Sequence, residues 1–451
     1  MTIQEEAQAI SDQFEVSPAQ VKESVREFRR LMKLGLEETG HAMTMIPSYV
    51  THVPKGSEKG TYLAIDLGGT NIRVCSVTLD GEKGFKIQQE KAAVSRELMT
   101  TDDPSKLFHF IATRIKKCVV EKLDAKGEYK LGFTFSFPVN QTGPAEGTLL
   151  RWTKGFDIPA AVGHDVCGML QTELDKMGVK VRVAALVNDT VGTLMARSYV
   201  SNGNGSLVGA IYGTGTNGAY LEKMTNIKKL GNEAQHENMV INTEWGSFDN
   251  ALTTIGNTPF DVALDKLTPN PGNQMFEKRV SGMFLGELLR QCLLTLSTNA
   301  PGLGGAGLFS GQTLTQLNQP WSLDTSVLSM MEGDNAEDMA VTSTIIQKEL
   351  GLTTSVPERG AIKQIVRAIG RRAARLAAVP MAAIVISSAA ERTDVSIDIG
   401  VDGSVVEYYP NFIAMMRESL RDALDRRAEE VNIEIATDGS GVGAALCALV
   451  A

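Results

Sequence analysis

The sequence lacks the long apolar runs and the paired cysteines that mark membrane proteins and disulfide-stabilised folds. No stretch approaches the roughly 20 apolar residues that a membrane-spanning helix needs, and residues 1–9 are polar and acidic. The five cysteines lie far apart without a C-x-x-C pair, and the five histidines form no H-E-x-x-H motif. We therefore expect a cytoplasmic protein with reduced thiols, no membrane partner and no metal held by its own side chains.

Basic residues are too few and too scattered for a nucleic-acid-binding surface. The chain has 44 Lys and Arg against 53 Asp and Glu, which gives a formal net charge of −9. Its longest basic run, residues 367–375, is interrupted by apolar residues at helical spacing, so it predicts the solvated face of a helix. Because nucleic-acid binding requires a Lys/Arg stripe along the phosphate backbone, we expect no such partner.

The chain is longer than one compact core normally holds, because its 451 residues are 43% hydrophobic, an ordinary globular proportion. A strand, a glycine turn and a second strand are predicted over residues 62–79. The pattern recurs over 207–221 and, more loosely, over 395–404. Such hairpins in both halves suggest two related domains that face each other across a ligand-binding cleft.

Helical spacing of apolar residues separates these hairpins. It predicts a helix over 17–36, starting at Ser17-Pro18, and further helices over 107–119 and 362–376. The apolar run 382–386 then predicts a buried strand, and residues 301–307 predict a glycine-rich loop. Strands that alternate with helices indicate an α/β fold.

Three glycine-containing turns are suited to an anion. The turn Asp66-Leu67-Gly68-Gly69-Thr70-Asn71 lets backbone N–H groups approach a phosphate, and Arg73 adds charge. Residues 213–217 form a second turn, and residues 438–443 form a glycine loop that opens a helix. For the first turn alone, an ordinary β-hairpin is an equally good interpretation. Three such loops spread over both halves favour phosphate binding.

A polar triplet, Asn188-Asp189-Thr190, follows the apolar run 183–187 at the carboxyl end of a predicted strand. An aspartate at this edge can accept a proton from a hydroxyl group. By position alone a helix cap is the better interpretation, because Asn and Asp commonly begin helices.

Three charged residues stand beside aromatic or glycine residues, namely Lys154, Glu244 and Glu277. In a sugar site, carboxylates and amides accept hydrogen bonds from hydroxyl groups. Isolated charged residues more often lie on the surface without a special role, so both interpretations stay open at this point.

Longer segments resemble the hexokinase family. Residues 131–138 (Leu-Gly-Phe-Thr-Phe-Ser-Phe-Pro) and 151–157 (Arg-Trp-Thr-Lys-Gly-Phe-Asp) are similar to its sugar-binding signature, and 186–192 (Leu-Val-Asn-Asp-Thr-Val-Gly) to its catalytic segment. The resemblance runs from about residue 63 to residue 449. It implies the actin-like, ribonuclease-H-like α/β fold, with a small and a large domain around a cleft. The implied small domain is 57–189 with 433–451, and the implied large domain is 1–56 with 190–432.

The resemblance also implies an ATP-dependent kinase for the 6-hydroxyl of glucose or a related hexose, acting as a monomer or homodimer. Asp189 and Lys154 would be catalytic, with Asp189 as the general base, and sugar binding would close the cleft. The implied cofactors are ATP and Mg²⁺, the ion being held mainly through the nucleotide phosphates. The implied sugar-binding residues are Ser136, Thr153, Lys154, Asn188, Asp189, Asn217, Glu244 and Glu277. The implied nucleotide-binding residues are Asp66, Leu67, Gly68, Gly69, Thr70, Asn71, Arg73, Lys91, Thr214, Gly282, Thr325, Gly403, Ser404, Gly439 and Ser440.

Within the family, the stretches 208–217 and 242–246 are closer to fungal glucokinases than to broad-specificity hexokinases. The stretch 253–261 departs from the family's usual Pro-Thr-x-Tyr-Asp pattern, beside the implied sugar-binding glutamates. Two alternatives to an active kinase stay open: a sensor that binds sugar and nucleotide with little turnover, and an actin- or chaperone-like ATPase. The segments 135–138 and 152–154 argue against the ATPase, which needs no sugar site.

Overall fold

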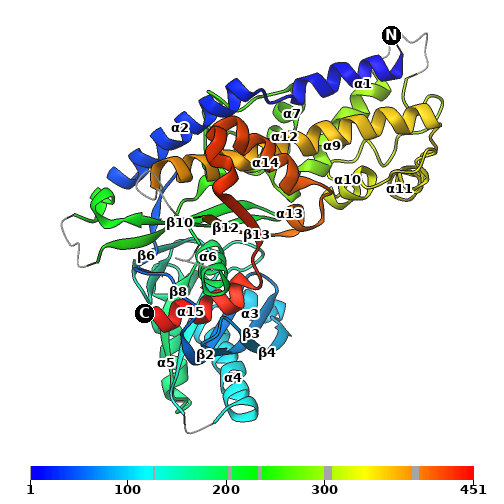
Figure 1. The fold of residues 1–451 in the computed structure, drawn as a ribbon. Helices are drawn as coiled ribbons and strands as arrows, with labels where there is room; N and C mark the ends of the chain where they lie inside the picture. The colour runs from blue at the N-terminus through cyan, green and yellow to red at the C-terminus, as the bar shows by residue number, and fades with distance from the viewer. Residues whose placement is uncertain (1, 125–126, 202–205, 232–235, 299–306, 389–395) are drawn as a thin grey trace.

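The chain folds into two lobes, each built around its own β-sheet (Figure 1). The computed structural model describes residues 2–124, 127–201, 206–231, 236–298, 307–388 and 396–451. The amino-terminal helices lie in the upper lobe of Figure 1, and the carboxyl-terminal helix lies in the lower lobe. No helix in these described ranges is long and apolar enough to cross a membrane.

The lower lobe is centred on a five-stranded sheet of order β4-β3-β2-β5-β8. β2 and β3 form an antiparallel hairpin whose last pair is Leu67 with Ile72, so residues 68–71 connect the two strands there. β5 and β8 follow parallel to β2. The strands of this lobe are β2 (Lys59–Leu67), β3 (Asn71–Asp80), β4 (Phe85–Ala93), β5 (Tyr129–Phe135), β8 (Val181–Val187) and the separate hairpin β6 (Val139–Gly143) and β7 (Glu146–Leu149).

The upper lobe repeats this scheme in a six-stranded sheet of order β1-β11-β10-β9-β12-β13. β9 and β10 form the corresponding hairpin, with Tyr212 opposite Thr216, and β12 and β13 run parallel to β9. The predicted pair of related domains is therefore visible in the strand order. The strands of this lobe are β1 (Ile46–Pro47), β9 (Val208–Tyr212), β10 (Thr216–Lys223), β11 (Asn238–Asn242), β12 (Ile397–Asp402) and β13 (Val431–Ile435).

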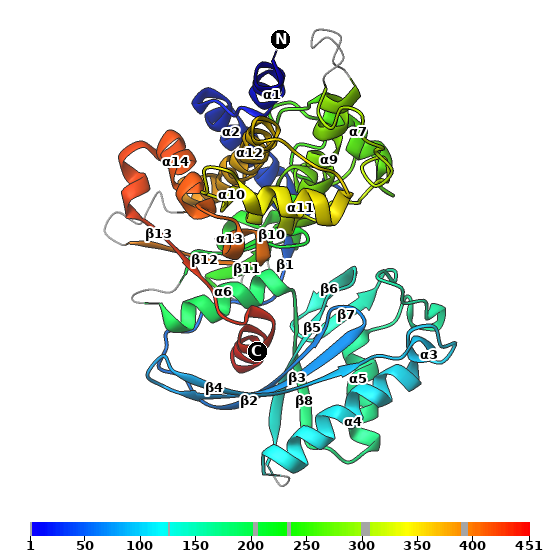
Figure 2. The same ribbon diagram turned by 90° about the vertical axis from the view of Figure 1, so that its right-hand side faces the viewer.

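Helices cover both sheets. In the lower lobe, α4 and α5 pack on one face of the sheet and α15 on the other (Figure 2). In the upper lobe, α12 is the central helix and contacts α1, α2, α9 and α14. The helices are α1 (Ile3–Ser11), α2 (Pro18–Glu37), α3 (Arg96–Met99), α4 (Pro104–Lys122), α5 (Val166–Lys176), α6 (Asp189–Val200), α7 (Pro259–Leu267), α8 (Glu277–Val280), α9 (Gly282–Thr298), α10 (Thr325–Glu332), α11 (Ala340–Leu350), α12 (Val356–Ser388), α13 (Ser404–Tyr408), α14 (Phe412–Leu424) and α15 (Ala444–Val450).

The predicted amino-terminal helix is confirmed as α2. The Ser17 hydroxyl caps it by accepting a hydrogen bond from the backbone N–H of Gln20, and Pro18 occupies its first position. Its apolar residues, among them Phe28, are buried in the core of the upper lobe. The helices predicted over 107–119 and 362–376 are likewise present within α4 and α12.

Two predicted strand assignments are wrong. Residues 382–386 do not form a strand but lie in the carboxyl-terminal part of α12. Residues 382–385 are all buried, so the apolar run carries no helical period. The third predicted hairpin is a single strand, β12, which leads through Gly403 into the helix α13. Residues 395 and 301–306 of these predictions lie outside the described ranges.

The basic run 367–375 is only partly a solvated face. Arg367 is exposed, as predicted, and Arg371 is partly exposed; each has an acidic partner. Arg372 and Arg375, by contrast, are buried and form ion pairs inside the lobe. Arg372 donates to both carboxylate oxygens of Asp261 at 2.7 and 2.8 Å. Burial opposes ionisation of Asp261, yet Arg372 lowers its pKa to about 2. These acidic partners lie far away in the sequence, so the run itself gave no signal of them.

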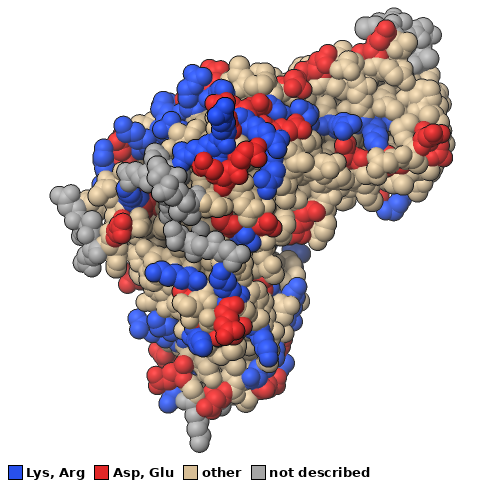
Figure 3. Space-filling model, viewed as in Figure 1, with Lys and Arg blue, Asp and Glu red and all other residues tan. Residues whose placement is uncertain are grey.

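The two lobes meet along α6 and the segment 439–443. This segment is a single turn of π-helix that continues directly into α15, which confirms the predicted glycine loop opening a helix. Gly192 of α6 packs against Gly439 and Gly443, where a Cβ atom would collide with backbone. Figure 3 shows a recess in the molecular surface where the upper lobe overhangs the lower one.

Candidate active site

The polar triplet at 188–190 lies between the lobes, directly after β8. Asn188 is the N-cap of α6, and its Oδ1 accepts hydrogen bonds from the N–H (3.0 Å) and the hydroxyl (2.5 Å) of Thr190. The capping interpretation is therefore correct for Asn188. Asp189 is the first residue of the helix and is partly exposed, with Oδ1 accepting from the same N–H at 2.9 Å.

Asp189 has the properties of a proton acceptor near neutral pH. Burial is the main cause that raises its pKa to about 6, and the negative charges of Glu244 and Asp66 add to the effect. The Thr190 N–H and the Lys154 cation oppose it. These interactions also show that residues of both lobes and of the loop 151–157 surround one carboxylate.

The upper lobe contributes a network of amide and carboxylate side chains. Asn217 donates to Glu244 at 3.1 Å and to Asn242 at 2.8 Å, and Asn242 donates to Glu244 at 2.8 Å. Glu244 has a left-handed backbone conformation, with φ of 56°. Burial raises the pKa of Glu244, although these two amides oppose the shift. The sequence singled out Asn217 and Glu244 as site residues but not Asn242, although Asn242 begins the stretch 242–246 that resembles the family.

Glu277 approaches this network from α8. Its Oε2 accepts a hydrogen bond from the Thr216 N–H at 2.9 Å. A Cβ atom on Gly215 would lie 2.6 Å from the same oxygen, so the turn 213–217 needs a glycine where the carboxylate docks. Burial raises the pKa of Glu277, and the charge of Glu244 adds to this. Two carboxylates therefore lie side by side next to Asn217.

Lys154 joins the loop 151–157 to the phosphate turn. It has φ of 59°, and its Nζ donates to the carbonyl oxygen of Gly68 at 2.9 Å. Burial lowers the pKa of Lys154, while the carboxylates of Asp189 and Asp66 oppose that shift. The loop rests on stacked aromatic rings, with Trp152 and Phe156 at 5.3 Å. The neighbouring residues Ser136 and Thr153 are both partly exposed at this end of the lower lobe.

The turn 66–71 is a β-hairpin turn and at the same time the predicted anion loop. Arg73 behind it is already paired: its Nη2 lies 2.5 Å from Asp438 Oδ1, 2.6 Å from Ser440 Oγ and 3.9 Å from Asp66 Oδ2. It thereby ties the turn to the segment 439–443. Lys91 pairs with Arg73 across β3 and β4 and is exposed on the edge strand.

A pocket of about 700 Å³ opens at the other end of the site. It brings together four of the predicted nucleotide-binding residues, Thr214, Gly282, Thr325 and Ser404. The amino terminus of α9 is pinned to the turn 213–217, because the Gly282 N–H donates to the Gly213 carbonyl at 2.7 Å. Gly403 has φ of 113°, and a Cβ there would lie 2.5 Å from the backbone of Tyr212.

The sequence missed the apolar walls of this pocket. They include Met283, Trp321, Met330 and Tyr408, which are 54%, 39%, 46% and 69% exposed. Large apolar side chains this exposed in a concave site are typical of a wall for a flat ligand. In the sequence, each of these residues is an aromatic or methionine residue close to a glycine, serine or threonine of the site. This combination is too common in proteins to predict a binding pocket.

The carboxylates of the site are not arranged as a metal centre. Within the described ranges there is no group of three or more His, Cys, Asp or Glu side chains that could hold an ion. All five cysteines are free and buried. Asp66 and Asp189 are nevertheless hard oxygen donors beside the phosphate turn, the donor type that suits a magnesium–phosphate complex.

Comparisons with known proteins agree with this geometry. Two hexokinase family models match, one over residues 6–199 and the other over 207–450. Glucokinase of Aspergillus niger is 47% identical over 99% of this chain and 97% of its own length, and Glucokinase-1 of Saccharomyces cerevisiae is 44% identical over 98% and 96%. A structure titled hexokinase from Schistosoma mansoni complexed with glucose superposes with a TM-score of 0.83 at 34% identity, covering 99% of both chains. The predicted two-domain α/β fold is thus confirmed, and the chain belongs to the hexokinase family.

Proposed function

We propose that the protein transfers the terminal phosphoryl group of MgATP to the 6-hydroxyl of glucose, giving glucose 6-phosphate and ADP. The observation that carries this proposal is the meeting of Asp189 with the carboxylate–amide network of Asn217 and Glu244, beside the turn 66–71. A sugar needs such acceptors and donors for its hydroxyl groups, and a phosphoryl donor needs such a turn. The most similar relatives named above are glucokinases, which supports glucose as the hexose.

The two lobes correspond to two domains in this proposal, residues 57–189 with 433–451 and residues 1–56 with 190–432. The packing of α15 on β2, β5 and β8 supports the return of the carboxyl-terminal segment to the small domain. Binding of glucose between them draws the domains together. Closure then excludes water from the phosphoryl group and completes the site only when the sugar is present.

Asp189 acts as the general base. A pKa of about 6 leaves this carboxylate mostly ionised at pH 7, while it binds a proton more readily than an ordinary aspartate does. As the 6-oxygen attacks the γ-phosphorus, Asp189 Oδ accepts the hydroxyl proton and the bond to the ADP oxygen breaks. Lys154, bonded to Gly68, holds the sugar loop against the phosphate turn and places positive charge beside Asp189.

The remaining residues hold the two substrates. Asn188, Asn217, Glu244 and Glu277, with Ser136 and Thr153 from the small domain, bind the hexose hydroxyl groups. Backbone N–H groups of the turn 66–71 stabilise the charge on the transferred group, and Mg²⁺ arrives bound to the phosphates. The pocket lined by Thr214, Gly282, Thr325 and Ser404 takes the nucleoside. Buried free thiols are consistent with a cytosolic location.

The direct test is ADP release by the purified protein with MgATP and, separately, glucose, fructose, mannose or no sugar. We expect strong release with glucose and little with fructose. Similar rates with all three hexoses would replace the glucose-selective assignment by a general hexokinase. Sugar-independent release would overturn the proposal, and glucose binding without turnover would indicate a sensor.

A further inference from the structure

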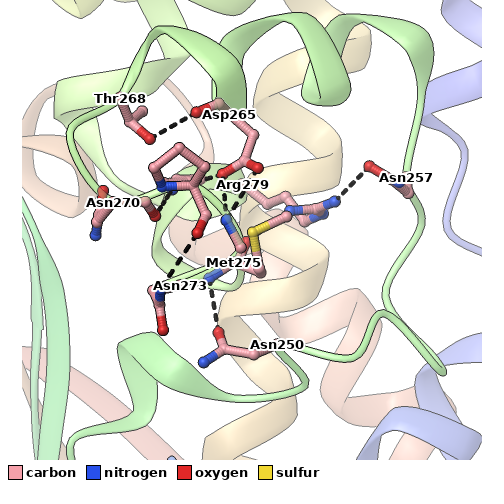
Figure 4. Close-up of polar contacts among 11 residues, drawn as sticks. Asn250, Asn257, Asp265, Thr268, Asn270, Asn273, Met275 and Arg279 are labelled. Atoms are coloured by element: carbon pink, nitrogen blue, oxygen red, sulfur yellow. Dashed lines mark hydrogen bonds and ion pairs between the residues drawn. The ribbon is translucent and has the colours of Figure 1, made fainter.

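Glu277 is held by a very short element. It is the first residue of α8, which is a single helical turn, and an isolated turn is not stable in water. The position of its carboxylate therefore depends on what anchors the turn. The next two residues, Lys278 and Arg279, are both cations, and they are only 2% and 1% exposed. Figure 4 shows polar contacts of Arg279 and of the nearby residues Asn250, Asn257 and Asp265.

Lys278 has an ordinary ionic partner. Its Nζ donates to Asp265 Oδ1 at 2.6 Å and to the carbonyl oxygen of Asn270 at 2.8 Å. The same carboxylate accepts from the Gly272 N–H. This cation is therefore neutralised locally and fastens the loop between α7 and α8.

Arg279 is held differently, by neutral acceptors. Its Nε donates to the carbonyl of Gly256 at 2.6 Å, its Nη1 to the carbonyl of Met275 at 2.7 Å and its Nη2 to Asn257 Oδ1 at 3.0 Å. Asp261, the carboxylate that affects it most, is itself in a two-bond pair with Arg372. A buried cation is costly unless its donors are satisfied, so its place is fixed by where these three oxygens lie.

Two of those oxygens belong to the segment 249–257, which is rigidly built. The Asp249 carboxylate accepts hydrogen bonds from the N–H groups of Thr253, Thr254 and Ile255 and from both threonine hydroxyls. Asn250 Oδ1 accepts from the Met275 N–H at 3.1 Å. These hydrogen bonds hold the backbone next to Gly256 and Asn257 and also at Met275, which together supply the acceptors of Arg279. Met275 lies two residues before Glu277, the first residue of α8.

The same segment follows the other glutamate of the sugar network. Glu244 is succeeded by a short 3₁₀ turn, and Ser247 Oγ donates to Gln274 Oε1 at 3.2 Å, three residues before Glu277. One continuous set of contacts therefore connects Glu244, the segment 249–257 and Arg279 with Glu277. The stretch that departs from the family's usual sequence at 253–261 supplies the central part of it.

We propose that Arg279, seated on Gly256 and Asn257, is a positioning residue that sets the affinity for the hexose by fixing Glu277. This inference rests on the proposed function, in which Glu277 binds the sugar. Arg279 touches no substrate, so its contribution belongs to the binding of the sugar and not to the transfer step. Loss of a hydrogen-bond acceptor for the Arg279 guanidinium lets α8 shift. The Glu277 carboxylate then moves away from its position beside Asn217.

The test is calorimetric titration of the full-length protein with glucose, combined with steady-state kinetics. Asn257→Ala removes one acceptor from an exposed loop residue, Asn257→Asp retains it, and Arg279→Lys keeps the charge without the three-pronged geometry. Arg375→Lys is the matched control, because Arg375 is a buried arginine of the same lobe that bonds to Val16 and Asp422. Melting temperatures are recorded for every variant.

We expect Asn257→Ala and Arg279→Lys to weaken glucose binding by ~5- to 20-fold. The KM for glucose rises by the same factor, while kcat and the KM for MgATP stay within ~2-fold. Asn257→Asp binds glucose as the unaltered protein does. Arg375→Lys lowers the melting temperature without changing glucose affinity.

Wild-type glucose affinity in both Asn257→Ala and Arg279→Lys would overturn the inference while leaving the proposed function intact. An equal loss in Arg375→Lys, or a parallel rise in the KM for MgATP, would show a merely structural role and overturn it too. If the unaltered protein binds no glucose, the proposed function itself fails, and the inference with it. Binding without turnover leaves the inference testable by the titration alone.

Discussion

The two ends of the site are built in opposite ways. At the proposed sugar end, polar groups are hydrogen-bonded to one another: Asn217 and Asn242 donate to Glu244, and Glu277 accepts from a backbone N–H. At the proposed nucleotide end, the pocket is lined by Met283, Trp321 and other exposed apolar side chains together with small residues.

This difference separates the two sources of binding: the polar end discriminates between ligands, and the apolar end contributes affinity in proportion to contact area. Where paired polar groups are buried, a ligand that lacks one hydroxyl leaves a partner unsatisfied, and discrimination between ligands is strong. Where apolar walls provide the affinity, each side chain contributes by its area and the loss of one is modest. Changes at the polar end should therefore cost more than changes at the apolar end.

Asp189→Ala should have the largest effect. It removes the proton acceptor, so kcat should fall by ~10³-fold or more while glucose affinity changes little. An ADP-release assay measures kcat, and a separate titration with glucose measures the affinity. Asp189→Asn is the isosteric control and should be equally impaired, because an amide cannot accept the proton at neutral pH. Substantial turnover in either variant would exclude Asp189 as the base.

Glu277→Ala should come next. It removes a charged acceptor of the sugar and frees the Thr216 N–H, so the KM for glucose should rise by ~10- to 100-fold. The KM for MgATP should be nearly unchanged, which a titration of the nucleotide at saturating glucose can establish. An unaltered KM for glucose would mean that the polar network does not reach the sugar, and the comparison between the two ends would fail.

Trp321→Ala tests the apolar end and should have a smaller effect. Loss of a partly exposed wall should raise the KM for MgATP by ~5-fold and leave the KM for glucose unchanged. Trp321 also donates its backbone N–H to Glu287, a bond that the substitution retains. If the KM for MgATP rose as much as the KM for glucose rises in Glu277→Ala, apolar contact area and polar hydrogen bonds would contribute equally to binding in this site.

The smallest expected change is a shift in pH dependence. Because Asp189 must be ionised to act, kcat/KM for glucose should fall as the pH drops through about 6, the value to which burial, Glu244 and Asp66 raise its pKa. Glu244→Gln removes one negative charge, so the acid limb should move to lower pH. Profiles of both proteins in the same buffers and MgATP cancel the titration of the nucleotide. A shift to higher pH would contradict the assigned interaction.

The sequence was most informative where function requires a fixed backbone. The glycine loop at 438–443 was found, and it carries glycines that close packing demands, because a Cβ atom on Gly439 or Gly443 would collide with the backbone of α6. The turns at 66–71 and 213–217 were found by the same pattern, although Gly215 faces the Glu277 carboxylate and a Cβ atom on Gly69 would meet no atom within 4 Å. Asn188 and Asp189 were noticed at the end of an apolar strand, but their position alone favoured a helix cap, and only the family resemblance gave them a role in the site. The resemblance to a known family then placed Glu244 and Glu277, which composition and periodicity alone left as surface charges.

The sequence failed where a residue's role depends on a distant partner. Arg372 and Arg375 look like the solvated side of a helix until Asp261 and Asp422 are brought against them by the fold. The run 382–386 was assigned to a strand because residues 382–385 are all buried, so the run shows no helical period. Trp321 and Tyr408 line a pocket that exists only after α9, α10 and α13 have assembled around it.

The carboxyl-terminal helix sets the order in which the protein can be completed during synthesis. β8 ends at Val187, but α15, which covers β2, β5 and β8, begins at Ala444. At ordinary rates of translation, the apolar face of that sheet waits on the order of tens of seconds for its cover. The sheet whose strands are completed first is thus the last to be covered, and a chain that stops early displays an uncovered sheet instead of a smaller enzyme.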